Sequence, residues 1–194
     1  MPMNRTDRRR QILEAYASML ETHPGKRVTT AALASEIDVS EAALYRHFPT
    51  KAKMIDGLID FAEETIFSRV GKIVDGGQRP SAKCRGILFL LLSFCETNPG
   101  FARVFVGDAL IGETPRLQAR VRQFFDRIET QLRQLAREAH AVRAQAPPLG
   151  PNACANLLLA SAEGRIAQFV RTEFKAVPTE DWAEQWTVLE SATF

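Results

Sequence analysis

Apolar residues recur at steps of three and four along most of the chain, and no segment shows the strict alternation of a half-buried β-strand. This pattern predicts an all-α protein. Clusters of proline, glycine and asparagine interrupt it and predict where the helices end. The expected helices span about residues 7–21, 30–37, 41–48, 51–74, 81–97, 101–110, 115–139 and 153–174, and residues 146–152 are expected to form an exposed, proline-rich linker.

The most informative segment is residues 28–53, in which two short helix patterns are separated by a tight turn and followed by a proline. Thr29 can cap the first of these helices, and Asp38 lies in the turn. Ser40 can cap the second helix, which ends before Pro49, and Thr50 can cap the helix that follows. This arrangement is typical of a helix-turn-helix that reads DNA.

The second helix of this motif has one face for packing and one for recognition. Leu44 and Phe48 are four residues apart, so they lie on the same side of the helix, and we expect this side to pack against the first helix. On the opposite side, Arg46 and His47 can donate hydrogen bonds to base edges, and Tyr45 can reach a phosphate. A surface helical hairpin with a mixed polar face is the alternative interpretation of the pattern alone.

Charge is distributed unevenly along the chain, although the net charge is only +2. Residues 1–53 contain nine Lys and Arg against six Asp and Glu, whereas the remainder contains sixteen against seventeen. The basic excess therefore lies with the helix-turn-helix, as phosphate binding requires. The basic side chains on its two sides are Arg5, Arg8, Arg9, Arg10, Lys51 and Lys53.

Composition favours a cytoplasmic protein with a large core. Hydrophobic residues make up 45% of the 194 positions, and the cysteines Cys84, Cys95 and Cys154 are far apart in apolar surroundings, as expected of buried free thiols. The N-terminus is polar and arginine-rich, without a signal peptide pattern. The most apolar run, residues 87–95, is far shorter than the roughly 20 residues of a membrane span. No membrane partner is expected.

Catalysis is not expected. The three histidines are scattered, and none has a cysteine or carboxylate at a metal-ligand spacing. The chain also contains neither a glycine-rich phosphate loop nor a nucleophile elbow. The sequence therefore predicts no enzyme activity, no cofactor and no metal site.

A homodimer is expected from the helices around residues 114–139 and 153–174. The first carries a long apolar stripe, and the second carries Ala160, Gly164 and Ala167 in a line that permits close helix approach. Together they suggest an intermolecular four-helix bundle, the alternative being that both stripes face the chain's own core. A twofold dimer would place two reading helices about one helical turn of DNA apart.

The motif segment LASEIDVSEAALYRHFPTK and the threonine pair before it resemble the TetR family. That resemblance implies a three-helix DNA-binding domain at residues 1–53 and a helical dimerisation and partner-binding domain at 54–194. The later segment NPGFARVF and residues 123–134 and 169–175 are similar to those family members that act as nucleoid-occlusion factors. This second resemblance extends through nearly the whole chain.

The resemblance implies a function. Nucleoid-occlusion factors of this type bind palindromic chromosomal sites as homodimers, and when bound to DNA they antagonise assembly of the division protein FtsZ. A location in the cytoplasm, on the nucleoid, follows. The alternative is a conventional TetR-type repressor that a small molecule releases from its operator. Residues 84–95 offer few polar groups beyond Ser93, which slightly favours a domain packed solid over a ligand pocket.

The family's functional positions can be carried over to this sequence. The turn position that is often glycine is Asp38 here, for which we expect only a small local cost. A groove with an apolar floor and a cationic edge is expected between the fourth and fifth helices, suited to the acidic C-terminal tail of FtsZ. Its expected residues are Phe61, Arg69, Leu90, Ser93 and Asn98, which without the resemblance would be ordinary core and surface. The expected DNA contacts are Thr29, Thr30, Ser40, Ala42, Ala43, Tyr45, Arg46, His47 and Lys51.

Overall fold

The computed structural model describes residues 5–141 and 147–194, and in these ranges it contains helices and no strand. The predicted all-α class is confirmed. The elements are α1 (Arg5–Thr22), α2 (Thr30–Glu36), α3 (Glu41–His47), α4 (Lys51–Asp75), α5 (Pro80–Thr97), α6 (Pro99–Phe105), the 3-10 helix η1 (Asp108–Leu110), α7 (Pro115–Ala141), α8 (Pro151–Arg171) and α9 (Trp182–Thr193).

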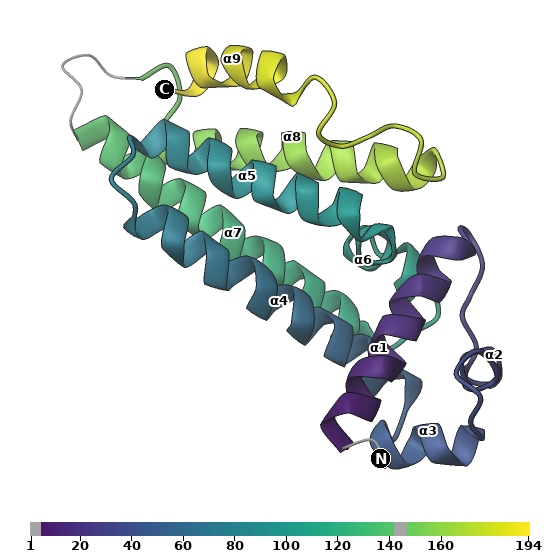
Figure 1. Ribbon diagram of the computed structural model, residues 1–194. Coiled ribbons are helices and arrows are strands. Elements are labelled where there is room, and N and C mark those ends of the chain that lie inside the picture. Colours follow the sequence, from purple (N-terminus) through teal and green to yellow (C-terminus); the bar gives the residue numbers. More distant parts are fainter. Residues whose placement is uncertain (1–4, 142–146) are drawn as a thin grey trace.

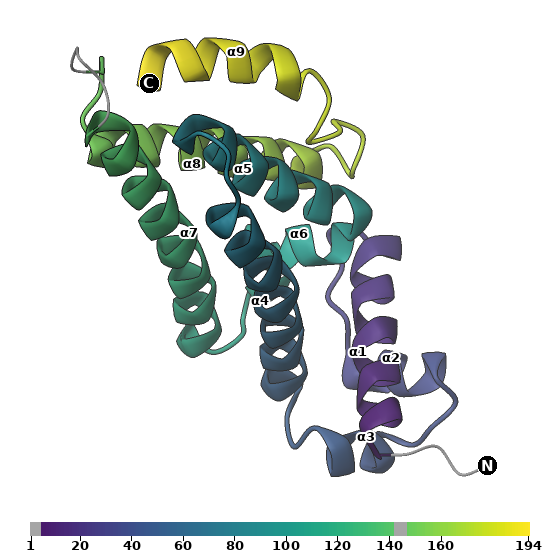
Figure 2. The same ribbon diagram turned by 60° about the vertical axis from the view of Figure 1, so that its left-hand side comes forward.

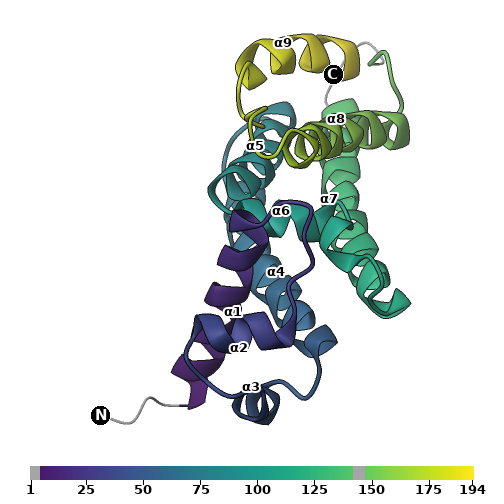
Figure 3. The same ribbon diagram turned by 90° about the vertical axis from the view of Figure 1, so that its right-hand side faces the viewer.

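The helices form two parts, which we call the head and the body. The head, α1 to α3, lies at one end of the molecule, and the long helix α4 leaves it and runs along the body (Figures 1 and 2). The body consists of α4 to α8, with α9 on the outer side at the end remote from the head (Figure 3). The N-terminal helix and the C-terminus thus lie at opposite ends.

Aromatic rings fill the interior of the body. Phe105 stacks on Phe124 with ring centroids 4.6 Å apart, and Phe125 meets both rings edge-on at 5.7 and 5.2 Å. Phe94 packs on Phe101 and Phe105 at 5.2 and 6.3 Å. Such aromatic pairs add about 0.5–1.5 kcal/mol each beyond the area they bury. These rings thus join α5, α6 and α7 in one aromatic cluster.

A buried arginine joins the head to the body. Arg103 of α6 is only 2% exposed, and its guanidinium donates to the carbonyl oxygens of Leu20 at 2.8 Å, His23 at 2.9 Å and Lys26 at 3.1 Å. Its Nε donates to the carboxylate of Asp108. These carbonyls belong to the end of α1 and the following turn, and that of His23 also accepts from the amide of Lys26 at 3.1 Å. We call this set of contacts the Arg103 latch.

The backbones of α6 and α1 also touch beside the latch. A Cβ placed on Gly100 would lie 2.3 Å from the carbonyl oxygen of Ala17, so no other residue fits here without movement. A separate set of ion pairs joins α4 to α7, because Asp56 binds Arg116 at 3.1 Å and Arg120 at 2.8 Å. Burial alone would raise the pKa of Asp56, but the hydrogen bond from Lys53 and the two arginines outweigh it and lower that pKa.

Three sequence expectations need correction. The expected helix at 101–110 is interrupted, because Gly107 takes a left-handed backbone with φ of 82° and separates α6 from η1. The linker is shorter than expected, since α8 begins at Pro151; residues 147–150 precede it, and residue 146 lies outside the described ranges. Helix α9 is not predicted at all.

For α7 the structure supports the alternative, an apolar stripe that faces the chain's own core. Its apolar stripe is buried within the chain's own body, so it is not available to a second chain. The physical reason is that α5 and α8 of the same chain already cover it. The stripe consists of Leu117, Val121, Phe124, Ile128, Leu132 and Leu135.

Over the residues that the structure describes, no individual helix is both long and apolar enough to cross a membrane. Helices α5 and α6 meet that condition only as a pair, and the chain bends by 116° between them.

Candidate DNA-binding and partner-binding surfaces

The three helix starts in and after the head are capped as the sequence predicts. The hydroxyl of Thr29 accepts from the amide of Ala32 at 3.2 Å, and that of Ser40 accepts from the amide of Ala43 at 3.2 Å. Such a cap stabilises a helix by about 0.5–2 kcal/mol. Asp38 takes the left-handed conformation, with φ of 52°, so the turn between α2 and α3 has the geometry expected of it. Thr50 caps α4 in the same way.

A short chain of hydrogen bonds fixes α3 against the start of α2. The hydroxyl of Tyr45 donates to that of Thr30 at 3.2 Å, and the hydroxyl of Thr30 donates to the carboxylate of Glu41 at 2.7 Å. Tyr45 and Glu41 are exposed, and Thr30 between them is half-buried. The network holds the two helices in one relative orientation before any ligand binds.

The positions expected to contact DNA lie together on α2, α3 and the start of α4, but they are not equally accessible. Lys51 forms an ion pair with Glu113 at 2.7 Å, which holds its ammonium group beside the body. His47 is half-buried at the end of α3. Thr30 and Ala43 are half-buried as well, whereas the exposed positions are Thr29, Ser40, Ala42, Tyr45 and Arg46.

Arg9 has a role that the sequence does not reveal. Its Nη1 donates to the carbonyl oxygen of His47 at 2.5 Å, and its guanidinium lies 4.1 Å from the centre of the Phe48 ring. The arginine therefore ties α1 to the end of α3. Only its basic character is visible in the sequence, where it is indistinguishable from Arg8 and Arg10.

The expected partner-binding residues lie along two neighbouring antiparallel helices (Figure 1). Phe61 of α4 is 50% exposed, and its ring packs on Phe101 of α6, just beyond the C-terminal end of α5, with centroids 5.7 Å apart. At the other end of the pair, a Cβ on Gly86 would lie 3.5 Å from Ile73.

The other four expected partner-binding residues are half-exposed or exposed. Leu90, Ser93 and Asn98 are all accessible on α5 and its C-terminal end, and the side chain of Asn98 donates to the carbonyl of Phe94 at 2.9 Å. Arg69 is exposed and forms no ion pair with any described residue. The surface made by these five residues is apolar near Phe61 and cationic at Arg69, and we call it the α4–α5 surface.

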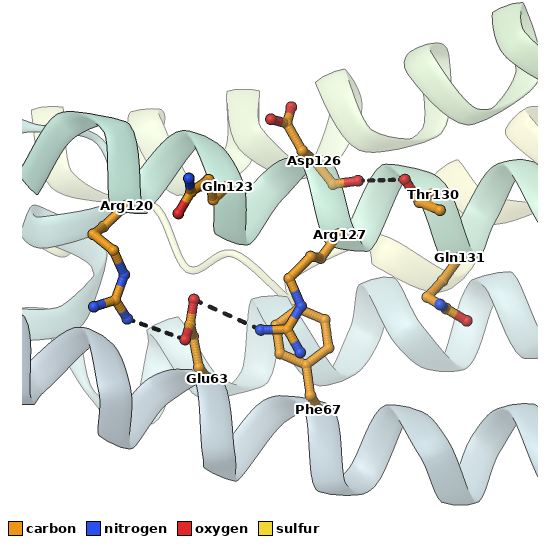
Figure 4. A pocket seen from close by; sticks show the side chains of 8 residues that line it. All are labelled: Glu63, Phe67, Arg120, Gln123, Asp126, Arg127, Thr130 and Gln131. Carbon is orange, nitrogen blue, oxygen red and sulfur yellow. Dashed lines mark hydrogen bonds and ion pairs between the residues drawn. The ribbon is translucent and has the colours of Figure 1, made fainter. Parts of the chain in front are cut away.

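A surface depression of about 580 Å³ lies where α4 faces α7. Glu63 lies between Arg120, at 3.1 Å, and Arg127, at 3.7 Å, and Arg127 also covers the ring of Phe67 with its guanidinium 3.6 Å from the ring centre (Figure 4). Charged groups that already neutralise one another line this groove. It is a poor site for an apolar ligand.

Helix α8 presents the line of small residues to solvent. Ala160, Gly164 and Ala167 are exposed, and a Cβ added to Gly164 would have no atom within 4 Å. Leu157, 38% exposed, extends the same line toward the start of the helix. This face of α8 can therefore receive another helix at close range.

Helix α9 lies beside α8 and adds to this face (Figures 1 and 3). Arg165 of α8 fastens the connection between them, since it donates to the carbonyl of Pro178 at 2.5 Å and to the side chain of Gln185 at 2.6 Å. Val188 on the outer side of α9 is 67% exposed. The two helices together form what we call the α8–α9 face.

Comparison with known proteins gives matches along nearly the whole chain. A family model of the SlmA-like type, "Tetracyclin repressor-like, C-terminal domain", matches residues 81–193, and "Bacterial regulatory proteins, tetR family" matches residues 12–58. The protein named nucleoid occlusion factor SlmA from Marinomonas sp. (strain MWYL1) is 54% identical over 189 residues, 97% of this chain and 96% of its own. The SlmA of Shewanella halifaxensis is 53% identical over 184 residues, covering 95% and 93% of the two chains.

Solved structures share the fold at much lower identity. The regulator FadR from Bacillus subtilis, in complex with stearoyl-CoA, aligns with a TM-score of 0.79 at 12% identity and covers 95% of this chain and 99% of its own. The regulator MbdR from Azoarcus sp. CIB aligns with a TM-score of 0.79 at 16% identity, covering 95% and 98%. The resemblance of the sequence to the TetR family is thus confirmed, and the chain belongs to that family and, within it, to the SlmA group.

Proposed function

We propose that this protein is a nucleoid-occlusion factor, in which a homodimer bound to palindromic DNA antagonises assembly of the FtsZ ring over the chromosome. The observation that carries the proposal is the identity of more than half of the residues with proteins named nucleoid occlusion factor SlmA, over nearly their full length. The preformed helix-turn-helix and the accessible α4–α5 surface are consistent with it. The proposed division into domains is residues 1–53 for DNA and 54–194 for dimerisation and the partner.

DNA recognition is assigned to the exposed face of α3 and the start of α2. Arg46 is the exposed residue of α3 with donors suited to guanine, and the small side chain of Ala42 permits close approach to the groove. The hydroxyls of Thr29 and Tyr45 lie where a phosphate would pass. These contacts position the protein, and Arg46 carries base preference. His47, Ala43, Thr30, Ser40 and Lys51 complete the proposed interface.

Substitutions at these positions are expected to have different effects. Arg46→Ala should cost about 1–3 kcal/mol on the preferred duplex and relax base preference. Tyr45→Phe and Thr29→Ala should instead weaken binding to all sequences alike, because phosphate contacts carry no sequence information. Fluorescence anisotropy on a duplex selected from a random library, and on a scrambled one, measures both effects.

A conservative variant tests whether the hydroxyl of Thr29 itself is needed. Thr29→Ser keeps the hydroxyl that caps α2 and should bind like the wild type, whereas Thr29→Ala loses both roles. If Tyr45→Phe and Thr29→Ala bind the preferred duplex with unchanged affinity, the assignment of these residues is wrong.

Dimerisation is assigned to the α8–α9 face. A line of small residues lets two helices approach closely, and the exposed Val188 and Leu157 would be buried by a second copy. A single helix-turn-helix contacts too few bases for tight specific binding, so the palindromic site itself requires two copies. The proposed bundle therefore consists of α8 and α9 from each chain.

The partner site is assigned to the α4–α5 surface. An extended acidic segment such as the C-terminal tail of FtsZ would place an apolar side chain on Phe61 and a carboxylate on Arg69. An arginine without an ion-pair partner in the described part of the chain is suited to such a carboxylate, since no internal contact has to be broken. Leu90, Ser93 and Asn98 would line the path between them.

Disrupting this surface is expected to separate the two activities. Phe61→Ala or Arg69→Asp should weaken binding of an FtsZ tail peptide by about 30-fold or more, the loss typical of an interface hot spot. The affinity for duplex DNA should stay nearly unchanged, because α3 is remote from this surface (Figure 2). Titration of labelled peptide and of labelled duplex against each variant provides the two measurements.

Matched variants test whether these effects are local. Ile111→Ala removes another exposed apolar side chain, and Arg137→Asp reverses the charge of an exposed arginine on α7. Both should bind the tail peptide like the wild type. The α4–α5 surface would be excluded as the site by either of two results. One is an equal loss of peptide affinity in the control variants, and the other is unchanged peptide affinity in Phe61→Ala and Arg69→Asp.

A conventional repressor controlled by a small molecule is the competing function. Its ligand would occupy the interior of the body, where the cluster of Phe94, Phe101, Phe105 and Phe124 lies. If a metabolite releases the protein from its duplex and the duplex-bound protein has no effect on FtsZ, this function replaces the proposed one.

A further inference from the structure

A small cavity lies where the head meets the body. Its volume is about 220 Å³, and it is enclosed by the end of α1, the turn before α2, the start of α4 and the segment from α6 to η1. It is separate from the α3 face, the α4–α5 surface and the α8–α9 face. Its polar and charged lining residues are Tyr16, Lys26, Arg27, Lys51, Arg103 and Asp108.

The most unusual group in this cavity is the hydroxyl of Tyr16. The side chain is 1% exposed, and the hydroxyl has no hydrogen-bond partner in the part of the chain that the structure describes. Tyr16 lines the cavity, so a ligand that occupies it can accept a hydrogen bond from this hydroxyl.

The cavity carries surplus positive charge. Lys51 is paired with Glu113, and Arg103 with Asp108. Lys26 and Arg27 form no ion pair with any described residue. Four cations against two carboxylates leave a surplus of two positive charges around one small space.

The backbone is shaped to keep Arg27 beside this space. A Cβ on Gly112 would lie 2.6 Å from Nη2 of Arg27, and Gly112 has φ of +76°, which a residue with a side chain rarely adopts. The guanidinium thus lies directly over a glycine. Burial raises the pKa of Tyr16 and Glu113 adds to this, while Arg103 and Arg27 oppose it, as expected if all these charges surround the phenol.

We propose that this cavity is a binding site for a small oxyanion of the phosphate class. Such an anion accepts the Tyr16 hydrogen bond, neutralises Lys26 and Arg27, and fits a volume that is too small for the usual 300–1,000 Å³ of a drug-sized ligand. It touches the head through Tyr16 and Arg27 and the body through Arg103. The anion therefore fastens the head to the body from a position beside the Arg103 latch.

Inorganic phosphate is the probe for this site. Titration calorimetry of the full chain at constant ionic strength, with chloride as the reference anion, should give one saturable phosphate site per chain. Arg27→Gln and Tyr16→Phe should each weaken phosphate binding by about tenfold or more, because each loses a hydrogen bond to a charged acceptor. Tyr16→Phe removes an unpartnered hydroxyl, so its thermal stability without phosphate should not fall.

The same oxyanion chemistry has two sources, the free ion and the DNA backbone. If the occupant is the free ion, phosphate binding persists on protein saturated with duplex. If it is a backbone phosphate, free phosphate competes with duplex, and Arg27→Gln and Tyr16→Phe weaken duplex binding. Either result supports the site.

Two results would overturn it. One is the absence of saturable phosphate binding together with unchanged duplex affinity in both variants. The other is phosphate binding that Arg27→Gln and Tyr16→Phe do not weaken more than Arg137→Gln does, since Arg137 is exposed on α7 outside the cavity lining.

Discussion

Replacing Arg103 by methionine is expected to lower the free energy of unfolding by about 3–5 kcal/mol and to abolish DNA binding. Methionine is similar in size to the arginine stem but donates no hydrogen bond. The substitution leaves the carboxylate of Asp108 and three carbonyl groups of the α1 end without their donor. Because the latch holds the end of α1, we expect the head to unfold first.

Chemical denaturation followed by circular dichroism measures this loss, and hydrogen exchange of the head amides locates it. Arg103→Lys keeps the charge but reaches fewer of the four acceptors, so an intermediate loss is expected. Arg137→Met is the matched control at an exposed site and should change stability by no more than about 0.5 kcal/mol. If the free energy of unfolding falls no more in Arg103→Met than in this control, the proposed role of the Arg103 latch is contradicted.

Gly164→Leu is expected to convert the dimer to monomers without unfolding them. In a single chain the added side chain meets nothing, and leucine favours a helix over glycine by close to 1 kcal/mol. Across the proposed α8–α9 face, however, it would hold two helices apart. Duplex affinity should fall by roughly two orders of magnitude, because half of the about 4–10 kcal/mol by which specific binding exceeds non-specific binding is lost.

Sedimentation velocity at micromolar concentration measures the change in mass. Gly71→Leu provides the control, since Gly71 is also helical, exposed and without neighbours around an added Cβ. It should remain dimeric. A wild type that sediments as a monomer, or a Gly164→Leu variant that stays dimeric, would exclude the α8–α9 face as the interface.

The elements that the sequence predicts well are those with local signals at their ends. Thr29, Ser40 and Thr50 each cap a helix as expected, and Asp38 makes the turn. Helix α9 was missed because its start has no such signal. Asp181 before it takes a left-handed backbone with φ of 55° and makes no side-chain cap, and the helix is only twelve residues long.

Other features could not be predicted because they depend on contacts between distant parts of the chain. Periodicity shows that α7 has an apolar stripe but not whether its partner is the same chain or another one. Arg103 looks like any arginine until α6 meets α1, about 80 residues away in sequence. The ion pair of Lys51 with Glu113 and the contact of the Arg9 guanidinium with the Phe48 ring also join residues that are far apart in sequence.

The expected groove for a partner peptide stays a prediction. The sequence and the family resemblance select Phe61, Arg69, Leu90, Ser93 and Asn98, and the fold arranges them along two adjacent helices. Their accessibility is compatible with peptide binding. Only a partner can test the assignment, because exposed phenylalanine and arginine side chains occur on many surfaces.

The central claim is that the DNA-bound protein antagonises FtsZ assembly, and sedimentation of FtsZ polymers formed with GTP tests it most directly. Increasing amounts of the protein are added with a specific duplex selected from a random library, with a scrambled duplex, or with none. We predict that the polymer recovered in the pellet falls steeply with the specific duplex and much less in the other two series. An unchanged pellet at saturating specific duplex would contradict the proposed function.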